Sequence, residues 1–100
     1  MSQYRVHQLV GDPEFDLVVV IQSDFYDFID TRVVIPVRPQ SPRQLDEIVN
    51  PVFELGGGHY ALLTERMGTI PKSALGLQRG DLNTHSLEIS RAVDRLMTGF

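Results

Sequence analysis

The sequence contains no cysteine, and this absence excludes disulfide bridges, thiol nucleophiles and thiolate zinc sites. Long apolar runs are also missing, since the longest one, residues 17–21, is far short of the ~20 residues that span a bilayer. The first residues lead into no apolar stretch of signal length. We therefore expect a soluble cytoplasmic protein that has no contact with membranes and is stabilised by its hydrophobic core alone.

The sequence also lacks a cluster of positively charged residues. The nine basic residues are spread from Arg5 to Arg95 without forming a run, and the formal net charge is −4. Affinity for nucleic acids depends on a patch of cations that neutralises phosphates. Direct binding of DNA or RNA is therefore not expected.

The chain length predicts one domain, residues 1–100, because 100 residues leave little room for a second core. A chain this short buries only about 60 to 65% of its extended surface. Hydrophobic residues nevertheless make up 42% of the sequence. Apolar surface is thus left for a partner, and we expect a dimer.

The N-terminal half carries strand patterns. Residues 4–10 alternate loosely and run into a turn at Gly11–Glu14. Residues 15–21 are short and rich in β-branched side chains, which predicts a central strand covered on both faces. Residues 33–37 form another such run, but Pro36 cannot donate to a ladder, so it is expected at a bulge, at an edge or at the strand's end. A loop should follow over residues 38–43.

The middle of the chain predicts a hairpin. Residues 52–55 and 59–63 are short apolar segments joined by the glycine loop 56–58, which can supply left-handed conformations. A further strand, residues 67–71, ends in proline. Short strands at this spacing indicate a small barrel or sandwich.

The last segment has a helical period. Asn83 or Thr84 can cap the first free amides, and Gly99 lets the chain leave the helix. Apolar and small residues recur at steps of four and three and form one stripe: Leu82, Ser86, Ile89, Val93, Leu96 and Phe100. The apolar end allows two interpretations: Phe100 completes the stripe, or residues 97–100 form an anchor for another protein.

Several residues that suggest catalysis or metal binding have simpler interpretations. The glycine triplet lacks the lysine and hydroxyl of a phosphate loop, and Ser23 has no evident base, so capping of a strand end is its expected role. No metal-binding spacing links the histidines His7, His59 and His85. No calcium-loop glycine accompanies the acidic residues Asp24, Asp27 and Asp30. We expect no metal and no cofactor.

An ordered set of motifs over essentially the whole chain resembles the CcdB toxins of toxin–antitoxin pairs. The motifs are Ile21-Gln22-Ser23-Asp24, Arg32-Val33-Val34-Ile35-Pro36, Pro51 before the hairpin, Thr64, Met67-x-x-Ile70-Pro71, Leu75-Gly76 and a closing helix that ends in a penultimate glycine. The resemblance implies a mainly β, SH3-like small barrel of the CcdB/MazF type, with a C-terminal α-helix, that forms a homodimer. It also implies a non-enzymatic poison of DNA gyrase.

The resemblance further implies two binding surfaces. Contacts with the gyrase A subunit are expected from Phe25, Tyr26, Asp94, Met97, Thr98, Gly99 and Phe100. A CcdA-like antitoxin, with which the toxin represses its own operon, is expected to contact Gly11, Glu14, Arg38, Arg43, Gly57 and His59. The toxin would then contact DNA only through the antitoxin.

The chain departs from the family pattern at Thr98, where the best-studied pattern has tryptophan. Losing a buried indole would cost on the order of 2 to 4 kcal/mol of binding energy. Three outcomes are open: Phe100, Phe25 and Tyr26 supply the aromatic area, gyrase is bound weakly, or the target differs. Two rival functions are a degenerate toxin that binds only its antitoxin and an mRNA interferase of the MazF or Kid type. The interferase would have to use His7 or His59 with Arg66 and Asp24.

Overall fold

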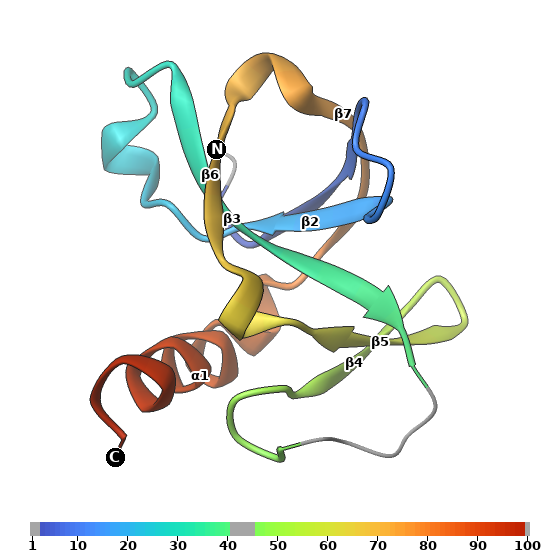
Figure 1. Ribbon diagram of the computed structural model, residues 1–100, viewed down its shortest axis with the longest axis vertical. Coiled ribbons are helices and arrows are strands. Elements are labelled where there is room, and N and C mark those ends of the chain that lie inside the picture. Colours follow the sequence, from blue (N-terminus) through green and yellow to red (C-terminus); the bar gives the residue numbers. More distant parts are fainter. Residues whose placement is uncertain (1–2, 41–45, 100) are drawn as a thin grey trace.

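The computed structural model describes residues 3–40 and 46–99, which form an antiparallel sheet curled into half a barrel, with a helix packed against it (Figure 1). The strands are β1 (Arg5–Leu9), β2 (Leu17–Val20), β3 (Thr31–Pro39), β4 (Val52–Leu55), β5 (Gly58–Leu62), β6 (Gly68–Pro71) and β7 (Leu75–Asp81). The helical elements are the 3₁₀ turns η1 (Asp24–Tyr26), η2 (Thr64–Arg66), η3 (Lys72–Ala74) and η4 (Asn83–His85), and the α-helix α1 (Ser86–Thr98). The predicted fold class, mainly β with a C-terminal helix, is confirmed.

The strand β2 is central to the sheet, whose order is β4-β5-β3-β2-β1-β7, with β6 paired to β3. Successive side chains of a strand point to opposite faces. Val19 accordingly packs with Val6 and Ile35 on one face, whereas Val18 and Val20 pack on the other. The prediction of a central strand covered on both faces is confirmed.

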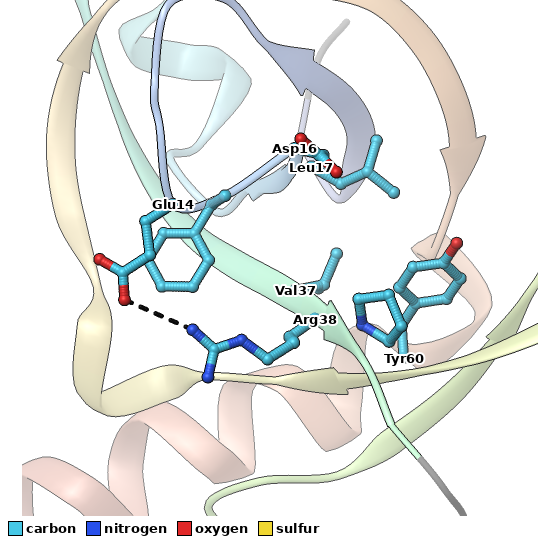
Figure 2. A pocket seen from close by; sticks show the side chains of 8 residues that line it. Glu14, Asp16, Leu17, Val37, Arg38 and Tyr60 are labelled. Atoms are coloured by element: carbon cyan, nitrogen blue, oxygen red, sulfur yellow. Dashed lines mark hydrogen bonds and ion pairs between the residues drawn. The ribbon is translucent and has the colours of Figure 1, made fainter.

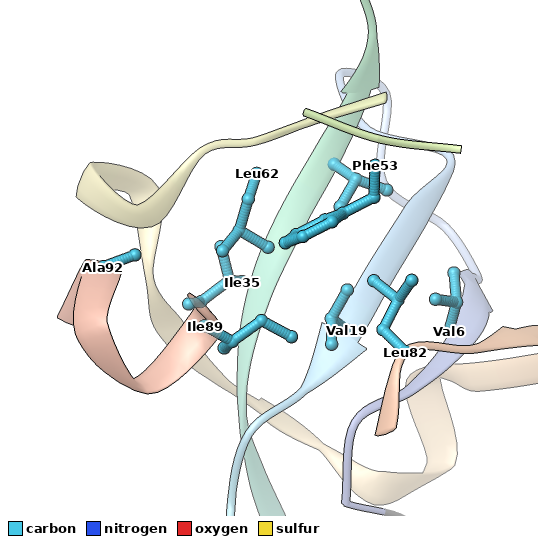
Figure 3. Packing of buried hydrophobic residues seen from close by; sticks show 9 residues of the cluster. Val6, Val19, Ile35, Phe53, Leu62, Leu82, Ile89 and Ala92 are labelled. Atoms are coloured by element: carbon cyan, nitrogen blue, oxygen red, sulfur yellow. The ribbon is translucent and has the colours of Figure 1, made fainter. Parts of the chain in front are cut away.

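The main core lies between the sheet and α1 (Figure 3). Ile89 and Ala92 of α1 are buried, and they belong to one cluster with Ile35, Leu62 and Phe53 from the sheet. Each large apolar side chain buried in this way contributes roughly 1.5 to 3 kcal/mol. The helix is thereby fixed on the sheet, next to η2.

Pro36 lies inside β3, which continues to Pro39, so the predicted loop over 38–43 begins too early. Next to Pro36, the second neighbour of β3 changes from β6, which pairs with residues 31–34, to β5, which pairs with residues 37–39. The Pro36 carbonyl accepts a hydrogen bond from the Leu63 amide (2.9 Å). The nitrogen that cannot donate thus lies at the junction between two partner strands, where no ladder bond is lost.

The glycine hairpin has a two-residue turn and not the predicted three-residue loop. Gly56 and Gly57 have φ angles of 56° and 86°, and Gly58 is already the first residue of β5, paired with Leu55. Positive φ at both central residues is the geometry that suits a two-residue hairpin turn.

The start of the helix differs from the prediction that Asn83 or Thr84 is its cap. The Asp81 carboxylate accepts a hydrogen bond from the Asn83 amide (2.8 Å) at the start of η4. The α-helix proper begins at Ser86, without a side-chain cap. Among residues 3–40 and 46–99, no helix has the length and apolar character needed to cross a bilayer.

Candidate functional site

The end of α1 presents an apolar side chain on an ordered helix. Met97 is 70% exposed, and the Thr98 hydroxyl donates to the Asp94 carbonyl (2.7 Å). Gly99 has φ +79°, and its amide donates to the Arg95 carbonyl (2.8 Å), which ends the helix as predicted. Phe100, the last residue of the predicted gyrase contact set, lies outside the described residues.

A second exposed apolar group is the aromatic loop, residues 25–29. Phe25 and Phe28 are 79% and 77% exposed, and Tyr26 and Ile29 are also exposed. The Phe25 and Tyr26 rings meet edge to face with their centroids 5.3 Å apart. Contiguous apolar side chains on a surface indicate an interaction site. Sequence reasoning included Phe25 and Tyr26 but missed Phe28 and Ile29.

The two predicted parts of the gyrase contact set are not brought together within one chain. Figure 1 shows η1 and the end of α1 toward opposite ends of the long axis of the molecule. Asp94 is exposed on α1 and lines a hollow with Tyr4, Ile21 and Ser90. Its carbonyl accepts the hydrogen bond from the Thr98 hydroxyl, so Asp94 is grouped with the helix end.

Two arginines share one carboxylate beside the first hairpin. Glu14 accepts hydrogen bonds from Arg66 (2.9 Å) and Arg38 (3.4 Å), and both guanidinium groups lie over the Phe15 ring, 5.2 and 5.1 Å from its centroid. We call these four residues the arginine cluster. The sequence predicted Glu14 and Arg38 as antitoxin contacts, but it named Arg66 only for the interferase alternative and did not include Phe15. The pairing of Arg66 with Glu14 spans 52 positions.

A groove of about 100 Å³ adjoins the arginine cluster (Figure 2). Its walls include Leu17, Val37, Pro39 and Tyr60. Glu14, Asp16 and Arg38 also line it, so the groove combines apolar walls with charges of both signs and suits a partner segment that carries apolar and charged side chains.

Three further residues of the predicted antitoxin set, Gly11, Gly57 and His59, do not line this groove. Gly11 is in the turn of the first hairpin, with φ +83°, and Gly57 is at the tip of the glycine hairpin. His59 precedes the groove residue Tyr60 on β5, so its side chain points to the opposite face of the sheet. Arg43 lies outside the described residues.

The turn of the first hairpin, which leads to the groove residues Glu14 and Phe15, is fixed by the side chain of Asp12. Its carboxylate accepts hydrogen bonds from the amides of Phe15 (2.8 Å) and Glu14 (2.7 Å). These two bonds, that from Phe15 first, lower the pKa of Asp12 below its usual 3.8, with a small further effect of Arg66. The turn is therefore held by an ionised carboxylate.

The residues that an interferase would need have separate partners. His7 bonds the Gly76 carbonyl through Nδ1 (3.0 Å), Asp24 accepts from the Gln3 amide (2.8 Å), and Arg66 pairs with Glu14. Among the described parts of the chain, no three His, Asp or Glu side chains gather as a metal site would require.

Comparisons with known proteins agree with this fold. A family model described as "CcdB protein" matches residues 3–99. Among solved structures, the chain is similar to one described as "Endoribonuclease in complex with its cognate antitoxin from Mycobacterial species", with a TM-score of 0.76 and 12% sequence identity. That match covers 97% of this chain and 94% of the other. At this identity the similarity shows a common fold alone.

Proposed function

The chain belongs to the CcdB family, and from this premise we propose that it is the toxin of a toxin–antitoxin pair and that its target is the A subunit of DNA gyrase. The observation that carries the proposal is the exposure of Met97 and Phe25, 70% and 79%, at positions where the resemblance implies target contacts. The protein acts by binding: it holds gyrase in the complex in which DNA is cut, and it performs no chemistry of its own.

The aromatic loop replaces the tryptophan that is missing at the helix end. A buried aromatic side chain contributes 150 to 250 Å² of contact area, and Phe25, Tyr26 and Phe28 form an exposed group of three. In this proposal the aromatic rings of the loop supply the binding energy that a tryptophan at position 98 supplies in the best-studied family pattern. Met97 remains the apolar contact on α1.

A homodimer would let an aromatic loop and a helix end contact gyrase at the same time. Because the aromatic loop and the end of α1 lie toward opposite ends of the long axis of one molecule (Figure 1), we infer that a second copy brings one element of each kind to the same target surface. The dimer is the form in which we propose that gyrase is bound.

The antitoxin binds at the arginine cluster and the groove beside it. Glu14 accepts only one hydrogen bond from each arginine, so other donors of both guanidinium groups can reach a carboxylate of the partner. A CcdA-like antitoxin bound here supplies the DNA contacts for repression of the shared operon. The toxin itself, with a net charge of −4, does not bind DNA directly.

A supercoiling and cleavage assay with purified gyrase tests the proposal. The intact chain should inhibit supercoiling and accumulate cleaved DNA. Deletion of residues 97–100, which removes the exposed Met97, should strongly weaken both effects, while circular dichroism and antitoxin binding stay unchanged. Unchanged inhibition after the deletion would contradict the role of the helix end.

An RNA-cleaving toxin is the second candidate, favoured by the fold shared with the endoribonuclease. In that case Arg66 would stabilise a phosphate, and the purified chain would cleave RNA without gyrase. RNA cleavage that is lost on Arg66→Ala would support this candidate. A chain that binds its antitoxin but acts on neither RNA nor gyrase would be a degenerate toxin.

A further inference from the structure

The backbone of the aromatic loop is held by one buried arginine. Arg32, on β3, is only 8% exposed. Its guanidinium donates to the carbonyl oxygens of Ile29, Thr31 (2.9 Å) and Asp27 (3.0 Å), and its Nε lies 3.9 Å from the Asp27 carboxylate. One rigid fork of donors thus fixes three carbonyls in and just beyond the loop.

A glutamine fixes the other side of the loop. Gln22 donates from Nε2 to the Tyr26 carbonyl (2.9 Å) and accepts at Oε1 from the Val33 amide (3.0 Å). The Ser23 hydroxyl accepts from the Phe25 amide (3.2 Å). The amide side chain therefore connects the loop to β3.

These polar contacts order the loop, because its two phenylalanines, Phe25 and Phe28, point outward and are 79% and 77% exposed. None of the residues of η1 is buried, so apolar packing against the described part of the chain contributes little to holding the turn. A charged group is buried only at a cost unless it is paired and hydrogen-bonded. The burial of Arg32 is matched by its bonds to the loop, and the result is an ordered loop with exposed aromatic rings.

We propose that Arg32 and Gln22 are positioning residues that hold the aromatic loop in its binding conformation for the gyrase A subunit. This inference rests on the proposed function. A loop that is ordered before binding loses less conformational entropy on association. Arg32 and Gln22 therefore raise the affinity for gyrase without touching it.

Two variants test the inference. Arg32→Lys keeps the positive charge but removes the fork, and Gln22→Glu keeps an acceptor for the Val33 amide but removes the donor to Tyr26. Arg79→Lys, at an exposed position on β7, is the matched control. Amide hydrogen exchange reports the order of the loop in the free protein, and titration with the purified gyrase A subunit reports affinity.

In both variants we expect faster exchange over residues 25–31, unchanged exchange in β2 and α1, and roughly tenfold weaker binding of the A subunit. In a Phe25→Ala background, Arg32→Lys should weaken binding less, since there is less aromatic contact to position. A general loss of folding would raise exchange in β2 and α1 as well, and it would leave the effect of Arg32→Lys independent of Phe25.

Three outcomes overturn the inference. Unchanged loop exchange in both variants shows that the polar contacts do not order the loop. Faster exchange with unchanged affinity shows that loop order does not serve binding, while the proposed function stands. Failure of the wild-type chain to bind the A subunit removes the proposed function, and this inference with it.

Discussion

Two side chains on α1 have nearly the same exposure but different expected roles. Met97 is 70% exposed at the end of the helix, and Leu87 is 73% exposed in its first turn. Both are large, apolar and helical. They form a pair of exposed apolar side chains of similar size at different positions along the helix.

We expect Met97→Ala to weaken inhibition of gyrase by roughly fivefold or more, because truncation of a central apolar contact costs upward of about 1 kcal/mol. Leu87→Ala should leave inhibition unchanged. The measurement is the toxin concentration that halves supercoiling activity. Equal effects of the two substitutions would argue against a specific contact at the helix end.

The acid sensitivity of the protein is set in part by Asp12. The amides of Phe15 and Glu14 lower its pKa in the folded chain below the usual 3.8, and the amides of Val49 and Ile48 do the same for Asp46. A carboxyl whose folded pKa is lowered stabilises the fold above its unfolded pKa. This stabilisation is lost as the pH falls through the folded value.

Asp12→Asn should therefore be less stable than the wild type at neutral pH, with the difference shrinking as the pH falls below the usual carboxyl pKa of 3.8. Urea unfolding at several pH values measures this. A difference that stays constant with pH would mean that Asp12 stabilises the turn by its shape and not by its charge.

Among the secondary-structure elements, the sequence pattern predicted those that depend on contacts between residues close together in the chain. The helix follows from its apolar period, and the hairpin follows from the glycine triplet. The strand β7 was not predicted, because Leu75–Asp81 contains no β-branched residue; it is a strand because it pairs with β1. Gly76 fits that pairing, since a Cβ there would lie 3.1 Å from the Cβ of Gln8.

The sequence likewise predicted only some of the residues of the candidate site. Family resemblance supplied Glu14, Arg38 and Phe25 as contact residues. It included Arg32 in a motif but gave it no role, and it did not supply Arg66. Arg66 reaches Glu14 across 52 positions, and the role of Arg32 depends on where its buried guanidinium points. Neither property can be derived from spacing along the chain.

The glycine hairpin offers a test of backbone conformation. Ala at Gly57, with φ +86° and free space around it, should destabilise the fold by about 1 to 2 kcal/mol through left-handed strain alone. Ala at Gly58, which is not left-handed and whose Cβ would lie 3.4 Å from the Tyr60 ring, should cost less. Urea unfolding of both variants measures the difference, and equal losses would contradict a two-residue turn.

For the whole molecule, the arrangement of exposed groups predicts association. Large apolar side chains remain exposed on two elements, Phe25 and Phe28 in the aromatic loop and Met97 on α1, and these elements lie toward opposite ends of the molecule (Figure 1). We expect light scattering to give twice the 11.3 kDa of one chain. Phe25→Ala, which alters the proposed gyrase contact, should keep that mass.

A chain that stays at 11.3 kDa at micromolar concentration and still inhibits gyrase would contradict the dimer. In that case one chain would have to bind its target through only one of the two exposed groups.

The pairing of β1 with β7 has a consequence for protein synthesis. Arg5 pairs with Asp81, so the outer edge of the first strand made has no partner until residues 75–81 have been translated. Leu82, Ile89 and Ala92, which close the core, follow later still. A partly translated chain therefore cannot complete this fold, and a prematurely ended product would be an unfolded substrate for proteases with no activity as a toxin.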